Sequence, residues 1–188
     1  MTQLWSTVLI LGLLAGTAVA QTEMGVNLYG GGGVSFPSSD LSDVGKTGYH
    51  GLVGVGFSPV PSIETAARFA YNSFAVKDGG DDKFTVSEYG LDIRANLAAP
   101  VFNVRPYALI GGGFAKYDFP SSLPVEMLDG VLAGIKPETE FFYCIGGGIK
   151  VNAMPRVDFF LEARYTKLSA SDRNLDYLPV SVGLSLAL

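Results

Sequence analysis

The sequence has few charged residues, a single cysteine and no run of basic residues. Only 16% of its 188 residues are charged, whereas a soluble domain has about 25%. The net charge of −5 and the missing basic cluster argue against a nucleic-acid partner. Because Cys144 is the only cysteine, the chain has no internal disulfide and no cysteine-based zinc site.

Apolar runs long enough for a membrane helix are also missing after the N-terminal segment. That segment, residues 4–20, is apolar and ends in Ala18-Val19-Ala20. Small residues at positions 18 and 20 suit signal peptidase, so we predict a signal peptide over 1–20 and one domain over 21–188. The first residues, MTQ, include no Lys or Arg, which leaves a signal anchor or a different start as alternatives.

What the mature chain does contain is period-two alternation of apolar and polar residues. In the stretch VDFFLEARYTKL, Val157, Phe159 and Leu161 share one face and Asp158 and Glu162 the other. Helical periodicity does not persist, and 24 glycines oppose helix formation. We predict eight strands at residues 25–36, 47–58, 63–74, 84–97, 104–117, 140–151, 156–168 and 178–188.

The connections between these strands alternate in length. Three are short and contain proline, at 58–62, 98–103 and 152–156. Four are longer and polar, at 37–47, 75–83, 118–140 and 169–177. An even number of strands with short turns at one end and long loops at the other is typical of outer-membrane barrels. The predicted fold is an all-β, eight-stranded, antiparallel, up-and-down transmembrane β-barrel.

Alternation alone does not say which face lies inside. A soluble carrier would turn the apolar face inward, but a soluble surface has about 25–35% charged residues, and these polar faces are mostly Gly, Ser and Ala. Aromatic residues also recur near the strand ends, where membrane barrels place aromatic girdles: Tyr29, Phe36, Tyr49, Phe57, Tyr107, Phe114, Tyr117 and Tyr165. We therefore predict that the apolar face contacts lipid.

With that orientation, a set of charged residues points into a narrow lumen. The negative members are Glu64, Glu88, Asp92, Asp158 and Glu162, and the positive ones are Arg68, Arg94, Lys150 and Arg164. His50 is a further candidate. Side chains usually fill a barrel of this size, and buried charges require partners. We expect an ion-pair network that fills the lumen, with an ion-conducting path as the alternative.

Four segments make the chain resemble the small outer-membrane β-barrel family that includes the transmembrane domain of outer membrane protein A: 106–117, 142–151, 159–168 and 181–188. The resemblance implies a monomer in the cell outer membrane that contacts membrane lipids and lipopolysaccharide. It also implies a C-terminal sorting signal read by the outer-membrane assembly machinery, matched here by Ser181, Gly183, Leu186 and Leu188. Leu188 stands where the family usually has an aromatic residue.

No motif for catalysis, a cofactor or a metal emerges. Lipid-deacylating barrels have a serine two positions after their histidine, whereas Leu52 stands two positions after His50. The glycine runs at 30–33, 110–113 and 145–148 lie in strands and lack a phosphate-loop ending. The acidic turn at 77–83 misses the spacing of a calcium loop and includes two lysines.

The sequence therefore predicts a non-enzymatic protein with a structural, envelope-integrity or surface-contact role through long extracellular loops. The longest connection, 118–140, includes a stretch at 125–135 with the spacing of a short amphipathic helix. Three alternatives stay open at this point. They are a narrow channel for small solutes, an outer-membrane lipid hydrolase and a soluble lipid-carrying barrel.

Overall fold

The computed structural model describes residues 25–39, 41–60, 62–77, 82–97, 103–118, 139–170 and 173–188, the side chains of 44, 170, 173 and 174 excepted. The predicted signal peptide and the stretch 125–135 lie outside these residues. The strands are β1 (Gly25–Ser39), β2 (Gly48–Val60), β3 (Ile63–Ala75), β4 (Lys83–Asn96), β5 (Val104–Asp118), β6 (Thr139–Met154), β7 (Val157–Ala170) and β8 (Arg173–Ala187), with one short helix, α2 (Leu41–Val44), after β1.

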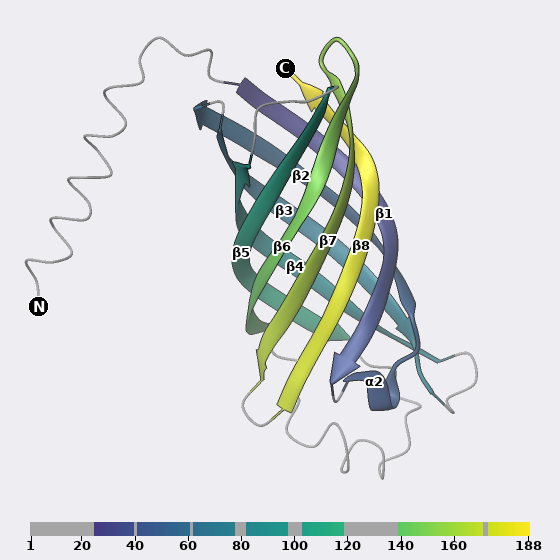
Figure 1. Ribbon diagram of the computed structural model, residues 1–188. Helices are drawn as coiled ribbons and strands as arrows, with labels where there is room; N and C mark the ends of the chain where they lie inside the picture. The colour runs from purple at the N-terminus through teal and green to yellow at the C-terminus, as the bar shows by residue number, and fades with distance from the viewer. Residues whose placement is uncertain are drawn as a thin grey trace, which may run out of the picture.

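The strands form one closed antiparallel barrel in which each pairs with the next along the chain (Figure 1). Pairing of β1 with β8, from Asn27↔Ala187 to Ser39↔Leu175, closes the sheet. The predicted eight-stranded up-and-down fold is confirmed. Because the strand number is even, β1 begins and β8 ends at the rim that carries the short turns, which we call the turn side. The opposite rim, where α2 lies, is the loop side (Figure 1).

The prediction of a long connection at 169–177 is wrong. Strand β7 runs to Ala170 and β8 begins at Arg173, and these two residues are paired. The polar composition of the stretch suggested a loop, but Leu175 and Tyr177 continue the inward alternation and are buried inside the barrel. Both strands therefore extend beyond the predicted limits at the loop side. Pro179 lies in β8 where the pairing of Thr166↔Tyr177 and Ala163↔Val180 leaves two intervening positions unpaired, as expected for a residue without an N–H.

The outer surface of the barrel is apolar. Large exposed hydrophobic side chains occur along every strand, including Leu28, Val53, Tyr71, Leu91, Ile110, Ile145, Leu161 and Val182. A soluble barrel would hide these side chains, so this surface rules out the soluble-carrier alternative. Within the described residues, no helix has both the length and the apolar character needed to cross a bilayer.

Three of the aromatic residues assigned to the girdles point inward instead. Tyr29, Tyr107 and Tyr117 are buried in the lumen. Each lies at the inward parity of its strand, and each finds polar or aromatic neighbours there, as Tyr107 does by donating a hydrogen bond to Glu162. The other five are exposed on the outer surface, as expected for girdle residues: Phe36, Tyr49, Phe57, Phe114 and Tyr165.

Two phenylalanines that interrupt the polar alternation also fill the lumen. Phe142 is completely buried and Phe160 packs edge-on against Tyr29, with ring centroids 6.4 Å apart. Glycine makes room for Phe142, because a Cβ at Gly90 would lie 2.8 Å from its Cζ. These aromatic side chains take up space that the small inward residues leave open.

Candidate functional site: the charged lumen

The charged residues predicted for the lumen all lie at inward positions of the barrel. They come from β3, β4, β6 and β7: Glu64, Arg68, Glu88, Asp92, Arg94, Lys150, Asp158, Glu162 and Arg164. Seven of the nine are buried, and Lys150 and Asp158 are half-buried near the turn side. The charged side chains therefore lie inside the barrel, away from its apolar outer surface.

Arg164 lies at the centre of this cluster. Its Nη1 lies 2.9 Å from Asp92 Oδ2 and its Nε lies 2.6 Å from Glu162 Oε1. Asp92 is shared with Arg68, whose Nε is 3.4 Å away. Each ion therefore has more than one partner of opposite charge, which offsets part of the cost of removing it from water.

Arg68 and Glu88 extend the cluster toward the loop side. Arg68 Nη2 lies 2.8 Å from Glu88 Oε2. The other oxygen of Glu88 accepts hydrogen bonds from Asn72 Nδ2, at 2.7 Å, and from the Tyr177 hydroxyl. Glu88 thus connects the ion pairs to Tyr177, a buried aromatic residue nearer the loop side.

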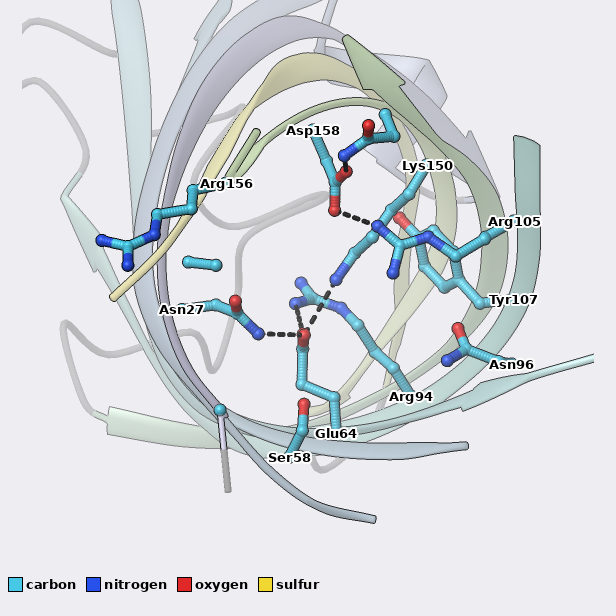
Figure 2. A pocket seen from close by; sticks show the side chains of 13 residues that line it. Asn27, Ser58, Glu64, Arg94, Asn96, Arg105, Tyr107, Lys150, Arg156 and Asp158 are labelled. Atoms are coloured by element: carbon cyan, nitrogen blue, oxygen red, sulfur yellow. Dashed lines mark hydrogen bonds and ion pairs between the residues drawn. The ribbon is translucent and has the colours of Figure 1, made fainter. Parts of the chain in front are cut away.

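Glu64, Arg94 and Lys150 extend the cluster toward the turn side (Figure 2). Glu64 accepts from Arg94 Nη1 at 2.6 Å and from Lys150 Nζ at 2.8 Å. Arg94 also approaches Glu162, with Nε 3.5 Å from Oε2, and stacks over the Tyr29 ring at 4.3 Å. Arg94 therefore joins the central ion pairs to those at the turn side.

Sequence reasoning missed Arg105. It lies at an inward position of β5, in step with Tyr107 and Leu109, and pairs with Asp158. With Arg105 included, the interior ion pairs unite five carboxylates with five cations. The signal available in the sequence was parity, because Arg105 is two positions before Tyr107 in the strand predicted at 104–117.

His50 lies inside the barrel in a chain of neutral hydrogen bonds. Its Nε2 is 2.7 Å from Ser181 Oγ and its Nδ1 is 2.9 Å from Ser35 Oγ. Ser35 uses its one hydroxyl proton to donate to Asn72 Oδ1 at 2.9 Å, so it accepts from His50 Nδ1–H. Nε2 then accepts from Ser181. The serine–histidine contact comes from β8 and β2, and not from neighbours in the sequence.

The residues of the predicted sorting signal lie on both faces of β8. Ser181 contacts His50, and Gly183 faces Phe160 inside the barrel. Leu186 and Leu188 are exposed on the outer surface near the turn side. Their recognition by the assembly machinery stays a prediction.

The two ends of the lumen differ in chemistry. At the loop side, buried apolar side chains fill the interior, and we call them the loop-side cluster: Phe74, Phe84, Val86, Leu168, Leu175 and Tyr177. Phe74 stacks on Phe84 with centroids 5.0 Å apart and meets Tyr177 edge-on at 5.6 Å. At the turn side a pocket of about 600 Å³ reaches inward as far as Arg94 and Tyr107.

This combination of a closed eight-stranded barrel, an apolar outer face and a charged interior characterises small outer-membrane barrels. The model of one family, the outer membrane protein beta-barrel domain, matches residues 6–187. The chain belongs to this family. Outer-membrane β-barrel proteins lie in the outer membrane and cross it with their strands, so the apolar face described above contacts membrane lipid. Among curated proteins, none matches the chain significantly in sequence.

Solved outer-membrane barrels share the fold at low sequence identity. Neisserial surface protein A is 14% identical with a TM-score of 0.62, over 86% of this chain and 96% of that one. OprG from Pseudomonas aeruginosa is 12% identical with a TM-score of 0.56, over 89% and 98%. Ail, the attachment invasion locus protein of Yersinia pestis, solved with the heparin analogue sucrose octasulfate, is 16% identical with a TM-score of 0.55, over 88% and 100%.

Proposed function

We propose that this outer-membrane barrel is a non-enzymatic protein that supports envelope integrity and makes surface contacts through its loop-side connections. The observation that carries the proposal is the filled lumen. Ion pairs centred on Arg164 fill its middle, and the loop-side cluster fills the end next to the loops. A barrel with this interior is a rigid membrane support for its loops.

The loop side faces the cell exterior in this proposal, because barrels of this kind have short turns in the periplasm and longer loops outside. The longest connection joins β5 to β6, between Asp118 and Thr139. Ail shares the fold and was solved with a heparin analogue, which supports a surface-contact role in a barrel of this shape.

The partners in this proposal follow from the two faces of the barrel. Lipid chains contact the apolar belt, and lipopolysaccharide surrounds the loop-side rim. The assembly machinery recognises the C-terminal segment with Ser181, Gly183, Leu186 and Leu188. The barrel is a monomer in the membrane, since closure of β1 on β8 leaves no free strand edge for pairing with a second copy.

A narrow channel is the second candidate, and the pocket at the turn side favours it. The pocket reaches inward from the turn side as far as Arg94. Rearrangement of the loop-side cluster would be required for a solute to pass. Single-channel recordings in planar bilayers separate the two candidates, because the structural barrel stays silent under applied voltage and a channel gives discrete conductance steps.

The hydrolase alternative has a serine–histidine contact but lacks two further requirements. The second ring nitrogen of His50 faces the Ser35 hydroxyl and not a carboxylate. Ser181 is 1% exposed, so a lipid ester has no route to its hydroxyl. The contact therefore supports a structural role for His50 in our proposal.

Complementation of a deletion strain tests the proposed role. Two alleles are compared, the full chain and a variant in which 119–138 is replaced by a short Gly-Ser turn. Sensitivity to a large hydrophilic antibiotic reports envelope integrity, and adhesion of cells to a sulfated-glycan surface reports surface contact. We expect both alleles to restore resistance and only the full chain to restore adhesion. Failure of the full chain to restore either property would contradict the proposal.

A further inference from the structure

The turn-side pocket lies at the mouth of the lumen and opens away from the loops. It encloses about 600 Å³, and residues from all eight strands or the turns between them form its wall. Figure 2 shows Arg94 and Lys150 reaching inward toward Glu64, while Arg105 reaches toward Asp158 from the wall. The buried side chains of Arg94 and Tyr107 close the pocket at its inner end. A molecule that enters from the periplasm therefore stops at this floor.

The pocket's two carboxylates already accept hydrogen bonds from neighbouring side chains. Glu64 accepts from Arg94 at 2.6 Å, from Lys150 at 2.8 Å and from Asn27 at 3.1 Å. Asp158 accepts from Arg105 through one oxygen and from Asn152 Nδ2, at 3.1 Å, through the other. Both carboxylates have a charged donor and an amide donor, and Glu64 has only about one of its four acceptor positions left for a ligand.

The donors of the same pocket are in excess. A lysine ammonium has three N–H groups and an arginine guanidinium has five. Lys150 directs one bond to Glu64 and Arg105 directs one to Asp158. Arg156, in the turn between β6 and β7, is exposed at the rim and has no ion-pair partner among the described residues. The pocket is therefore rich in unused donors.

The pocket lining also has more positive than negative side chains. Its lining has four cations, Arg94, Arg105, Lys150 and Arg156, against the carboxylates of Glu64 and Asp158. Arg94 also contacts Glu162 deeper in the lumen, with Nε 3.5 Å from Oε2. Apart from Arg156, which is exposed at the rim, Arg105 and Lys150 are more accessible than Arg94, with side chains 35% and 12% exposed against 5%. A ligand with several acceptors and negative charge complements this arrangement.

We propose that the turn-side pocket is an oxyanion-binding site that takes a phosphate group from the periplasmic side, held by Lys150 and Arg105 with Arg156 at the rim. A phosphate offers the acceptor oxygens that these donors lack. The phosphate belongs either to a small soluble molecule or to the headgroup of an inner-leaflet lipid. The site is separate from the loop-side contacts of the proposed function, and only its access from the periplasm rests on the orientation proposed there.

Nuclear magnetic resonance of the refolded full barrel tests the site. Inorganic phosphate is titrated into ¹⁵N-labelled protein in an uncharged maltoside detergent at constant ionic strength, with chloride as the matched anion. We expect saturable shifts at the amides of residues around Lys150 and Arg105, and none with chloride. A second arm adds phosphatidylglycerol, or a glycolipid without phosphate, to the same maltoside micelles. Shifts in the phosphate arm identify a soluble ligand, and shifts confined to phosphatidylglycerol identify a headgroup.

Paired variants separate this site from general charge attraction. The double variant Arg105→Gln/Lys150→Gln removes two donors from the pocket, and we expect its phosphate affinity to fall about tenfold or more, as expected for lost charge-assisted hydrogen bonds. Lys83→Gln/Lys116→Gln removes equal charge from the opposite end of the barrel and should leave affinity unchanged. Heat-dependent gel migration verifies that each variant is folded. Absence of saturable shifts in both arms, or equal affinity in the two double variants, would overturn the proposal.

Discussion

Arg164 and Asp92 lie 72 residues apart in the sequence, yet Arg164 Nη1 is 2.9 Å from Asp92 Oδ2 inside the barrel. Arg164 also bonds Glu162, two positions away on its own strand, through Nε at 2.6 Å. Its side chain is 1% exposed and that of Asp92 is 0% exposed. The pair therefore joins β4 to β7 across the lumen without access to bulk water.

Removal of Arg164 should be costly, because two buried carboxylates lose a charged partner. We expect Arg164→Ala to lower the free energy of unfolding by about 3–5 kcal/mol. Leu161→Ala, on the lipid-facing side of the same strand, should cost less because it takes no charged partner away from a buried carboxylate. Urea unfolding in detergent compares the two variants directly. An Arg164→Ala barrel that is as stable as the wild type and silent in a planar bilayer would show that Arg164 does not stabilise an ion-pair network in the lumen.

Glycine at position 90 should be required by the packing of Phe142. A Cβ there would lie 2.8 Å from the ring and 3.2 Å from the carbonyl oxygen of Gly112. We expect Gly90→Ala to destabilise the barrel by about 1–3 kcal/mol, as overpacking does. Gly51→Ala is the matched control, because a Cβ there would meet no atom closer than 4.0 Å. Equal unfolding curves for the two variants would show that Phe142 is not packed against Gly90.

The orientation of the barrel can be tested on intact cells. An epitope tag between Ser121 and Ser122 lies in the connection from β5 to β6, which we place outside the cell. A tag at Val60, where β2 ends at the turn side, should be in the periplasm. Antibody should therefore label the first tag on intact cells and the second only after the outer membrane is permeabilised. Labelling in the reverse order would contradict the assignment of the two rims.

Much of the fold was predictable because alternation depends only on local sequence. Each strand face is set by residue parity, so the inward position of Glu88 or Arg164 follows from its neighbours. Partner choice was not predictable. The strands are tilted and staggered, so the pairing of Arg164 with Asp92, and not with Glu88, depends on a register that distant strands set together.

Local composition also misled in two places. The stretch 169–177 is polar enough for a loop, yet Leu175 and Tyr177 keep β8 in the barrel because their side chains are buried in the loop-side cluster. Tyr29 and Tyr107 suggested girdles by their aromatic nature, although their parity points inward. In both cases alternation was the better guide, because it reports which face is buried whereas composition reports only an average.

The central claim, that the charged face lies inside and the apolar face contacts lipid, is tested most directly at two adjacent residues. Cys144 is buried in the lumen with 3% exposure, and Ile145 is 60% exposed on the outer face. In a bilayer, a spin label on Ile145→Cys in a Cys144→Ser background should relax faster with lipid-dissolved oxygen and not with a water-soluble nickel complex. Native Cys144 should resist maleimide until the barrel is unfolded. A label at 145 that responds to the nickel complex alone, together with a reactive Cys144, would contradict the account.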